Sequence, residues 1–283
     1  MKRIAILSVG AMSSRIAANL INAGYQVNLY NRTKEKAIPL VKLGAQYYPT
    51  PCEAIQNCDV VISLTKDDLA SHSIWLADDS GAINGLTKDQ IAIECSTLSV
   101  EWAQKLATRL QVVVPFLVAP IVGTLPNVEQ KTITFLVGGE AKILTEVESV
   151  LRDAGGATIL NIGSISQAMA MKLTVNSLLG IQVAALAEVL GMLGQYGISK
   201  NQAMDFLSNL PTLSPAAKGY GNLMKLDNHT PLFPVDLAEK DFGYILEISP
   251  SAPLAKATQE VLRLAIEHGY GGDNISALIE LYK

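Results

Sequence analysis

Two polar residues stand four positions apart in an apolar stretch and have the chemistry for proton transfer. Lys172 and Asn176 lie within residues 166–196, whose periodicity predicts one long helix. Residues i and i+4 share one face of a helix, and apolar surroundings lower the pKa of an ammonium group toward a useful range. Such a lysine gives a proton to a carbonyl oxygen or takes one from an alcohol. Spacing alone also allows a lysine that extends its charge into solvent.

A second candidate site is the turn that follows the first predicted strand. Residues 8–13, Ser-Val-Gly-Ala-Met-Ser, stand where dinucleotide-binding folds carry G-x-G-x-x-G. The middle glycine, Gly10, is kept and leaves room for a pyrophosphate at the start of the next helix. Ser13 is small enough for helix packing, and Ser8 need not clash if its backbone is extended. An ordinary strand–helix turn is the alternative.

The residues after the second predicted strand indicate which dinucleotide binds. An NAD-preferring site carries Asp or Glu there, to bind the ribose 2′-hydroxyl. The chain instead has Asn31, Arg32 and Thr33. Because a guanidinium pairs with a 2′-phosphate, Arg32 favours NADP(H) over NAD(H). The alternative is a solvated arginine beside a helix cap.

Short β-branched runs alternate with amphipathic stretches through the first part of the chain. The predicted strands are residues 4–9, 26–30, 60–64, 91–95, 112–116, 133–137 and 158–162. The predicted helices are residues 12–23, 34–43, 51–56, 100–110 and 142–154. This alternation predicts an α/β fold, a Rossmann-type doubly wound parallel sheet with helices on both faces and right-handed crossovers.

Strand patterns end at Gly163, and helical periodicity replaces them. The predicted helices are residues 166–196, 200–210, 237–249, 252–267 and a short one near 274–281. We therefore expect a dinucleotide-binding domain over residues 1–163 and an all-α C-terminal domain, for substrate binding and oligomerisation, over residues 164–283. A ligand cleft is expected between two such domains.

Composition narrows the class of protein. Hydrophobic residues make up 49% and charged residues 17%, enough for a large core. A net charge of −4 without a basic block argues against nucleic acid as a partner. The sparse cysteines, Cys52, Cys58 and Cys95, have no paired spacing, and the histidines are scattered, so we expect no disulfide framework and no metal site.

Two stretches bear on location. The opening residues lack the pattern of a signal peptide, so we expect a cytoplasmic protein. Residues 175–193 are apolar and long enough to cross a bilayer, but they contain Asn176, Gln182 and Glu188. A helix buried at a domain or subunit interface explains them better than a membrane span. We therefore expect no membrane partner, and a homodimer or homotetramer.

The start of the chain resembles the β-hydroxyacid dehydrogenases. Residues 4–23, then Gly-Tyr-Gln-Val at 24–27 and Tyr-Asn-Arg-Thr-Lys-Glu-Lys at 30–36, are similar to the opening of that family. The family includes 3-hydroxyisobutyrate dehydrogenases, glyoxylate/succinic semialdehyde reductases and 6-phosphogluconate dehydrogenases. The resemblance runs through the whole chain. It implies hydride transfer between a nicotinamide cofactor and a small carbonyl compound or 3-hydroxy acid.

Two internal segments extend the resemblance to the substrate. Glu-Cys-Ser-Thr-Leu-Ser at 94–99 resembles the family's Asp-x-Ser-Thr-x-Ser, which implies that Ser96 and Thr97 lie beside substrate and nicotinamide. Ala-Pro-Ile-Val-Gly-Thr at 119–124 resembles the family's substrate-carboxylate loop, which implies substrate contacts at Gly123 and Thr124. In that loop, valines at 118 and 122 replace the family's acid and serine.

The helical half carries the remaining matches. Lys172 and Asn176 match the family's K-x-x-x-N, which implies that Lys172 is the proton donor and acceptor and that Asn176 orients the substrate. Residues 233–241 resemble the family's F-x-x-x-x-x-x-K-D, which implies that Lys240 reaches the cofactor; a surface lysine is the alternative. The predicted cofactor-binding residues are Leu7, Ser8, Val9, Gly10, Ala11, Met12, Ser13, Asn31, Arg32, Thr33, Leu64, Thr65, Thr97 and Lys240.

Two rival functions remain. Imine reductases share the predicted architecture but usually replace the lysine, so Lys172 favours carbonyl chemistry. A non-catalytic, nucleotide-sensing relative is favoured by the departures at Ser8, Ser13, and positions 118 and 122. It is disfavoured by the retained Lys172, Asn176, Thr97 and Lys240.

Overall fold

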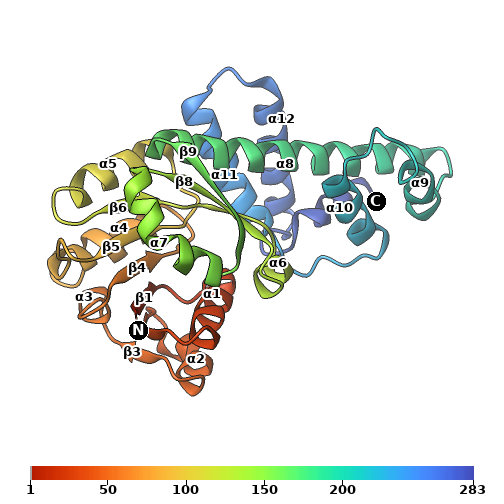
Figure 1. Cartoon of the computed structure of the whole chain (residues 1–283). Coiled ribbons are helices and arrows are strands. Elements are labelled where there is room, and N and C mark those ends of the chain that lie inside the picture. Colours follow the sequence, from red (N-terminus) through yellow and green to blue (C-terminus); the bar gives the residue numbers. More distant parts are fainter. Residues whose placement is uncertain (1) are drawn as a thin grey trace. The chain divides into compact units, whose positions relative to one another are not determined.

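A computed structural model describes residues 2–283 and divides the chain into two compact units (Figure 1). One unit ends at Lys172, and the other comprises Leu173–Lys283. The division falls inside the long helix α8 (Ile165–Gln195), so α8 contributes its first residues to the N-terminal unit and the rest to the C-terminal unit.

The N-terminal unit is built on one sheet, whose strand order is β3-β2-β1-β4-β5-β6-β8-β7, with β9 beside β8. All pairs from β3 to β6 are parallel, while β8 runs antiparallel to β6 and β7. The strands are β1 (Arg3–Leu7), β2 (Gln26–Tyr30), β3 (Gln46–Tyr48), β4 (Val60–Ser63), β5 (Ile91–Glu94), β6 (Phe116–Val118), β7 (Ile121–Val122), β8 (Ile133–Gly138) and β9 (Gly156–Gly163). Reversal of the order at β1 and β4 is the Rossmann arrangement, as predicted.

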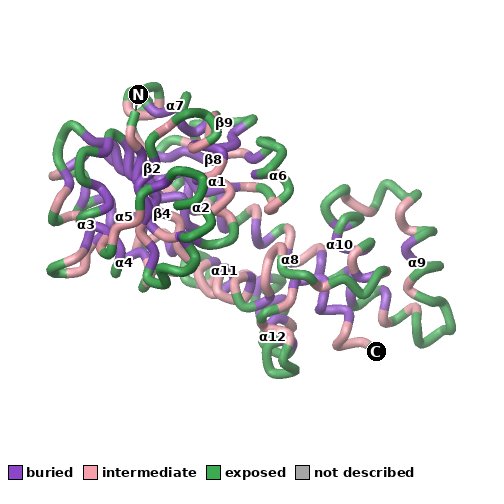
Figure 2. Tube along the Cα trace, turned by 90° about the horizontal axis from the view of Figure 1, so that it is seen from below, coloured by how far each residue is buried: buried purple, intermediate pink, exposed green. Residues whose placement is uncertain are grey.

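Helices cover both faces of this sheet because its central strands are apolar on both sides (Figure 2). Ile4 and Ile6 of β1 join the core under α1, α2 and α7, whereas Ala5 and Leu7 join the core under α3, α4 and α5. The helices are α1 (Ala11–Asn22), η1 (Lys34–Ala37), α2 (Ile38–Lys42), α3 (Pro51–Ala54), α4 (Asp68–Leu76), η2 (Ala82–Asn84), α5 (Val100–Leu110), α6 (Leu125–Glu129) and α7 (Ala141–Asp153). The doubly wound prediction is confirmed.

One predicted strand is wrong, and several short elements were not predicted. Residues 112–114 form the turn that ends α5, where Val113 and Val114 donate to the carbonyl of Leu110, and β6 begins at Phe116. The β-branched Val112 suggested a buried strand, but its side chain is 76% exposed. The unpredicted β3, β7, α4 and α6 are too short or too mixed in polarity for periodicity to detect.

The C-terminal unit is helical, as predicted. Its elements are the greater part of α8, then α9 (Lys200–Leu207), α10 (Pro215–Lys225), α11 (Val235–Ile248), α12 (Pro253–Glu267) and η3 (Ile275–Tyr282). The sequence did not predict α10, because Pro215 suggested a loop. Pro215 instead occupies the first helical position after the Ser214 cap, where proline is favoured.

Glycines of α8 bring its neighbours close within the C-terminal unit. A side chain at Gly180 would collide with the ring of Phe242 on α11, and one at Gly191 would collide with Tyr282. By length and composition α8 is also long and apolar enough to cross a membrane, with a mean hydropathy of 1.7. Core helices of soluble proteins can have the same length and composition.

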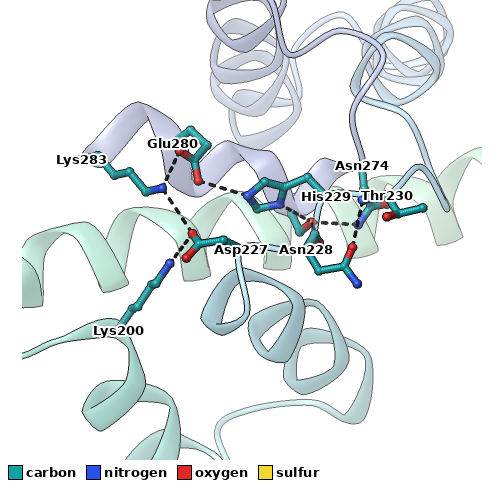
Figure 3. A network of polar contacts seen from close by, with 9 residues as sticks. Lys200, Asp227, Asn228, His229, Thr230, Asn274, Glu280 and Lys283 are labelled. Atoms are coloured by element: carbon teal, nitrogen blue, oxygen red, sulfur yellow. Dashed lines mark hydrogen bonds and ion pairs between the residues drawn. The ribbon is translucent and has the colours of Figure 1, made fainter.

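A polar network holds η3 against the loop that leads into α11 (Figure 3). The buried Asn274 accepts hydrogen bonds from the backbone amides of Leu232 and Phe233, at 3.3 and 2.9 Å. His229 lies 2.9 Å from the Ser276 hydroxyl and 3.1 Å from a Glu280 oxygen. The start of α11 is therefore fixed by residues near the end of the chain.

Two ammonium groups complete this network. The Lys283 ammonium lies 2.6 Å from Glu280 and 3.2 Å from Asp227, and Lys200 also pairs with Asp227. Oxygen and nitrogen atoms of Asp227, His229 and Glu280 lie within 4.8 Å of one another, a spacing that suits a metal ion. The lysines, however, already supply positive charge to both carboxylates.

We expect Asp227→Asn to make stability less sensitive to acid. A hydrogen bond from Lys200 lowers the pKa of Asp227, so its ion pairs stabilise the fold at neutral pH and are lost as the pH falls through that pKa. Urea unfolding at pH 7 should show a loss below about 1 kcal/mol, and a smaller difference from the unmodified protein near pH 3. Asp79→Asn, at an exposed position, is the control. An equal loss at both pH values would contradict the assignment.

Candidate functional site

The turn between β1 and α1 is fastened to the end of β2. The amide of Ser8 donates to the carbonyl of Tyr30 at 2.8 Å. The amide of Val9 donates to the side-chain oxygen of Asn31 at 2.9 Å, in a buried bond. Asn31 also donates to the carbonyl of Thr33 at 2.7 Å. These bonds set the path of the backbone where the phosphates of a dinucleotide are expected.

Ser8 does not have the extended backbone in which its side chain would avoid a clash. Its φ is +98°, in the region that favours glycine. The chain takes this conformation while the Ser8 amide stays bonded to β2. A glycine has this conformation without strain, which is why dinucleotide-binding turns begin with one.

Gly10 keeps the approach to the α1 N-terminus open. It caps the helix in an extended conformation, and a Cβ added to it would meet only the Ser13 hydroxyl, at 3.7 Å. The Ser13 hydroxyl accepts from the Gly10 amide at 2.7 Å. The first-turn amides, including those of Ala11 and Met12, have no acceptor inside the helix. With the helix dipole they form a seat that fits a pyrophosphate.

Positive side chains follow β2. Arg32 is exposed. Burial raises the pKa of Tyr30, and the positive charge of Arg32 opposes that rise. The Lys34 ammonium lies 5.5 Å from the centre of the Tyr47 ring. No acid stands between Tyr30 and Lys34.

The ends of β4 and β5 are joined by hydroxyl groups. The Thr65 amide donates to the Ser96 hydroxyl at 2.6 Å, and the two hydroxyls lie 3.0 Å apart. Ser96 in turn donates to Glu94 at 2.5 Å and is 1% exposed. Its hydroxyl therefore serves the fold, whereas Thr97 and Leu64 are half-buried and more accessible.

Glu94 is the centre of this cluster, and sequence reasoning gave it no role. Its oxygens accept from the Ser71 hydroxyl at 2.9 Å, the Trp75 indole at 2.8 Å and the Ser96 amide at 2.9 Å. Burial raises the pKa of Glu94, and the hydrogen bonds from Ser96, Trp75 and Ser71 oppose that rise. The available signal was an acid inside an apolar strand run, which is rarely tolerated without partners.

Cys95, next to Glu94, behaves as a core residue. Its side chain is 3% exposed, and burial raises the pKa of the thiol well above its usual value. A thiol that stays protonated is a poor nucleophile. Cys95 therefore packs in the core.

Gly123 and Thr124 lie between β7 and α6. Gly123 has a φ of +146°, and Thr124 caps α6 through a hydroxyl bond of 2.7 Å to Asn127. Helix α6 is bonded to α1, because the side-chain amide of Asn19 donates to the Val128 carbonyl at 2.9 Å. The predicted substrate loop is thus held to the helix of the predicted cofactor site.

Lys172 and Asn176 are both buried on α8, at 8% and 7% exposure. Within the C-terminal unit, Asn176 donates to Asp241 at 2.6 Å, and the Lys240 ammonium lies 2.8 Å from the other oxygen of Asp241. The Lys240 ammonium also lies 4.7 Å from the centre of the Tyr244 ring. Lys240 is therefore not a freely solvated surface lysine.

Asp241 was missed by sequence reasoning although it follows the predicted Lys240. It is 2% exposed and connects two of the residues that carry the resemblance. The signal was the Lys-Asp pair itself, since a charged pair in an apolar helix needs a buried partner.

The strand order brings most predicted cofactor residues together. Because β2, β1, β4 and β5 are parallel neighbours, their carboxyl ends meet at one edge of the sheet. Leu7 is the last residue of β1, and residues 8–13, 31–33, 64–65 and 96–97 follow the strand ends. Lys172, Asn176 and Lys240 instead lie on α8 and α11.

Comparison with known proteins matches both units. The family model described as the NAD binding domain of 6-phosphogluconate dehydrogenase matches residues 3–163. The model described as the NAD-binding of NADP-dependent 3-hydroxyisobutyrate dehydrogenase matches residues 166–282.

Individual proteins match over nearly the whole chain. Uncharacterized oxidoreductase YfjR of Bacillus subtilis is 32% identical over 99% of this chain and 100% of its own length. Glyoxylate/succinic semialdehyde reductase 2, chloroplastic, of Arabidopsis thaliana is 30% identical over 99% of this chain and 79% of its own. The solved structure of Psf3 in complex with NADP+ and 2-OPP has a TM-score of 0.91 at 18% identity, over 99% of this chain and 100% of that one.

We expect Glu94→Ala to destabilise the N-terminal unit by about 3 kcal/mol, because it leaves buried donors without an acceptor. Glu94→Gln, which keeps one acceptor oxygen, should cost less. Urea unfolding followed by tryptophan fluorescence measures both changes, with the exposed Glu101→Ala as control. Equal stability of Glu94→Ala and the control would show that the carboxylate does not hold the strand ends together.

Proposed function

Because the chain belongs to the β-hydroxyacid dehydrogenase family and is an NAD(P)-dependent oxidoreductase acting on hydroxyl groups, we propose that it transfers a hydride between NADP(H) and a small carbonyl compound or 3-hydroxy acid. A semialdehyde, glyoxylate or a compound like 3-hydroxyisobutyrate is the proposed substrate class. The observation that carries the proposal is the buried lysine on α8 together with a cofactor seat at the β1–α1 turn.

The preference for NADP(H) rests on the end of β2. The side-chain oxygen of Asn31 already accepts a hydrogen bond from the Val9 amide, and its side-chain nitrogen donates to the Thr33 carbonyl. It is thus a poor acceptor for a ribose hydroxyl. Arg32 is exposed, so its guanidinium is available to a 2′-phosphate. A carboxylate, which would repel that phosphate, is absent from residues 30–34.

In the proposed reduction, the bound nicotinamide supplies the hydride and the residues of the chain handle the proton. The Lys172 ammonium donates its proton to the carbonyl oxygen as the hydride reaches the carbonyl carbon, so the product is an alcohol. Lys172 then regains a proton from solvent. In the reverse direction the neutral amine takes the hydroxyl proton.

Asn176 is the proposed orienting residue. It lies one turn after Lys172 on α8, on the same helix face. Its side-chain amide donates to Asp241, which fixes the side-chain rotamer. Asp241 is thus a positioning residue in this mechanism.

Location and assembly are also proposals. The cytoplasmic location is proposed from the sequence alone. A homodimer or homotetramer is favoured by apolar side chains that α8 exposes in the C-terminal unit. Leu178 is 61% and Met192 is 55% exposed, and they recur at helical spacing on this unit. A second copy that covered them would remove this apolar surface from water.

We expect Lys172→Ala to lower kcat by about 10²–10⁴-fold, the usual loss for a missing general acid. NADPH affinity should stay within about twofold, because the lysine acts on the substrate rather than on the phosphates. Steady-state assays with semialdehydes and glyoxylate, beside a cyclic imine, measure the first effect. Lys142→Ala, at an exposed position, is the control. Unchanged turnover in Lys172→Ala would remove the lysine from the mechanism.

We expect Arg32→Ala to weaken NADPH by about tenfold or more and to leave NADH nearly unchanged, because only NADPH carries the 2′-phosphate. Calorimetric titration of both cofactors measures the difference, with Arg109→Ala as a control for the loss of an exposed charge. Equal losses for NADPH and NADH would refute the cofactor preference.

A further inference from the structure

We propose that the Ser8 hydroxyl binds a phosphate oxygen of the nicotinamide dinucleotide and so helps to determine cofactor affinity. The inference rests on the proposed function, since it assumes that the β1–α1 turn receives NADP(H). It assigns a role to the residue that departs most clearly from the glycine pattern of such turns.

The first observation is that Ser8 holds a conformation that glycine has at lower cost. At its φ of +98° the Cβ atom comes close to neighbouring backbone atoms, a contact that glycine avoids. The conformation is imposed from both sides, because the Ser8 amide bonds Tyr30 and the next amide bonds Asn31. Backbone strain of this kind is found most often at ligand-binding and active sites, where it is part of the mechanism.

The second observation concerns hydrogen bonds around the turn. Three polar side chains of the turn and of the adjoining β2 end have protein partners: Ser13 accepts from Gly10, Ser14 donates to Ala11 at 3.1 Å, and Asn31 makes two bonds. Over residues 2–283, the Ser8 hydroxyl makes no hydrogen bond to the protein. Ser8 is half-buried, so its hydroxyl is available to a ligand without being free in bulk solvent.

The third observation is the electrostatic setting. Ser8 immediately precedes the α1 N-terminus, whose amides and dipole attract anions. It also lies beside the end of β2, which carries Arg32. A phosphate oxygen is the acceptor that suits both neighbours. That oxygen belongs either to the pyrophosphate, which NADH and NADPH share, or to the 2′-phosphate, which only NADPH carries.

Two substitutions separate the hydroxyl from the strain. Ser8→Ala keeps Cβ and the unfavourable φ but removes the hydroxyl, whereas Ser8→Gly removes both. We expect Ser8→Ala to weaken cofactor binding by about tenfold or more, as for a lost hydrogen bond to a charged group. We expect Ser8→Gly to raise the melting temperature of the cofactor-free protein by about 2–4 °C relative to Ser8→Ala.

The experiment is calorimetric titration of the full chain and each variant with NADPH and with NADH, together with thermal melts without cofactor. Ser73→Ala, which loses an exposed hydroxyl on α4, is the matched control. A loss for both cofactors supports the proposal and assigns the pyrophosphate, and a loss for NADPH alone supports it and assigns the 2′-phosphate.

Two other results would overturn the inference, and they differ. If the unmodified chain binds the cofactor and Ser8→Ala binds it equally well, the hydroxyl has no role and the proposed function stands. If the unmodified chain binds neither cofactor, the proposed function fails, and the inference fails with it. Equal melting temperatures for Ser8→Gly and Ser8→Ala would refute the strain on which the inference depends.

Discussion

The position of the β1–α1 turn relative to the end of β2 is the constraint on which the cofactor site depends. Two hydrogen bonds set it, from Ser8 to Tyr30 and from Val9 to Asn31. They place the positive end of α1 next to the segment that carries Arg32. A dinucleotide needs both features together, because its pyrophosphate and its 2′-phosphate are joined through one ribose. Asn31 is therefore structural, and Arg32 is left to recognise the ligand.

Buried carboxylates hold other parts of the site by the same principle. Glu94 accepts hydrogen bonds from two side chains of α4 and from Ser96 at the end of β5. Ser96 in turn accepts from the amide of Thr65, so the carboxylate holds the ends of β4 and β5 together. In the C-terminal unit Asp241 connects Asn176 with Lys240. A buried carboxylate is costly unless donors satisfy it, so each one requires its neighbours to stay in place. Both acids support residues that the family resemblance implicates.

Local patterns predicted the sheet and the long helices well, because the alternation of strand-like with helical stretches and the helical periodicity of apolar residues can be recognised within short stretches of sequence. The failures have physical causes. Val112 is β-branched but exposed in a turn, and Pro215 starts a helix that the sequence did not predict. The roles of Glu94 and Asp241 depend partly on distant partners, Trp75 at 19 residues and Asn176 at 65, which no local window contains. The positive φ of Ser8 occurs where its amide bonds β2, a long-range contact that residue type alone does not reveal.

The account stands on one claim: this turn seats the phosphates of NADP(H). Isothermal titration of the unmodified chain with NADPH and, separately, with adenosine 2′,5′-bisphosphate tests that claim without any assumption about substrate. The account predicts saturable binding of NADPH, and competition by the bisphosphate, which carries the 2′-phosphate without the nicotinamide. Absence of heat with both compounds at millimolar concentration would contradict it.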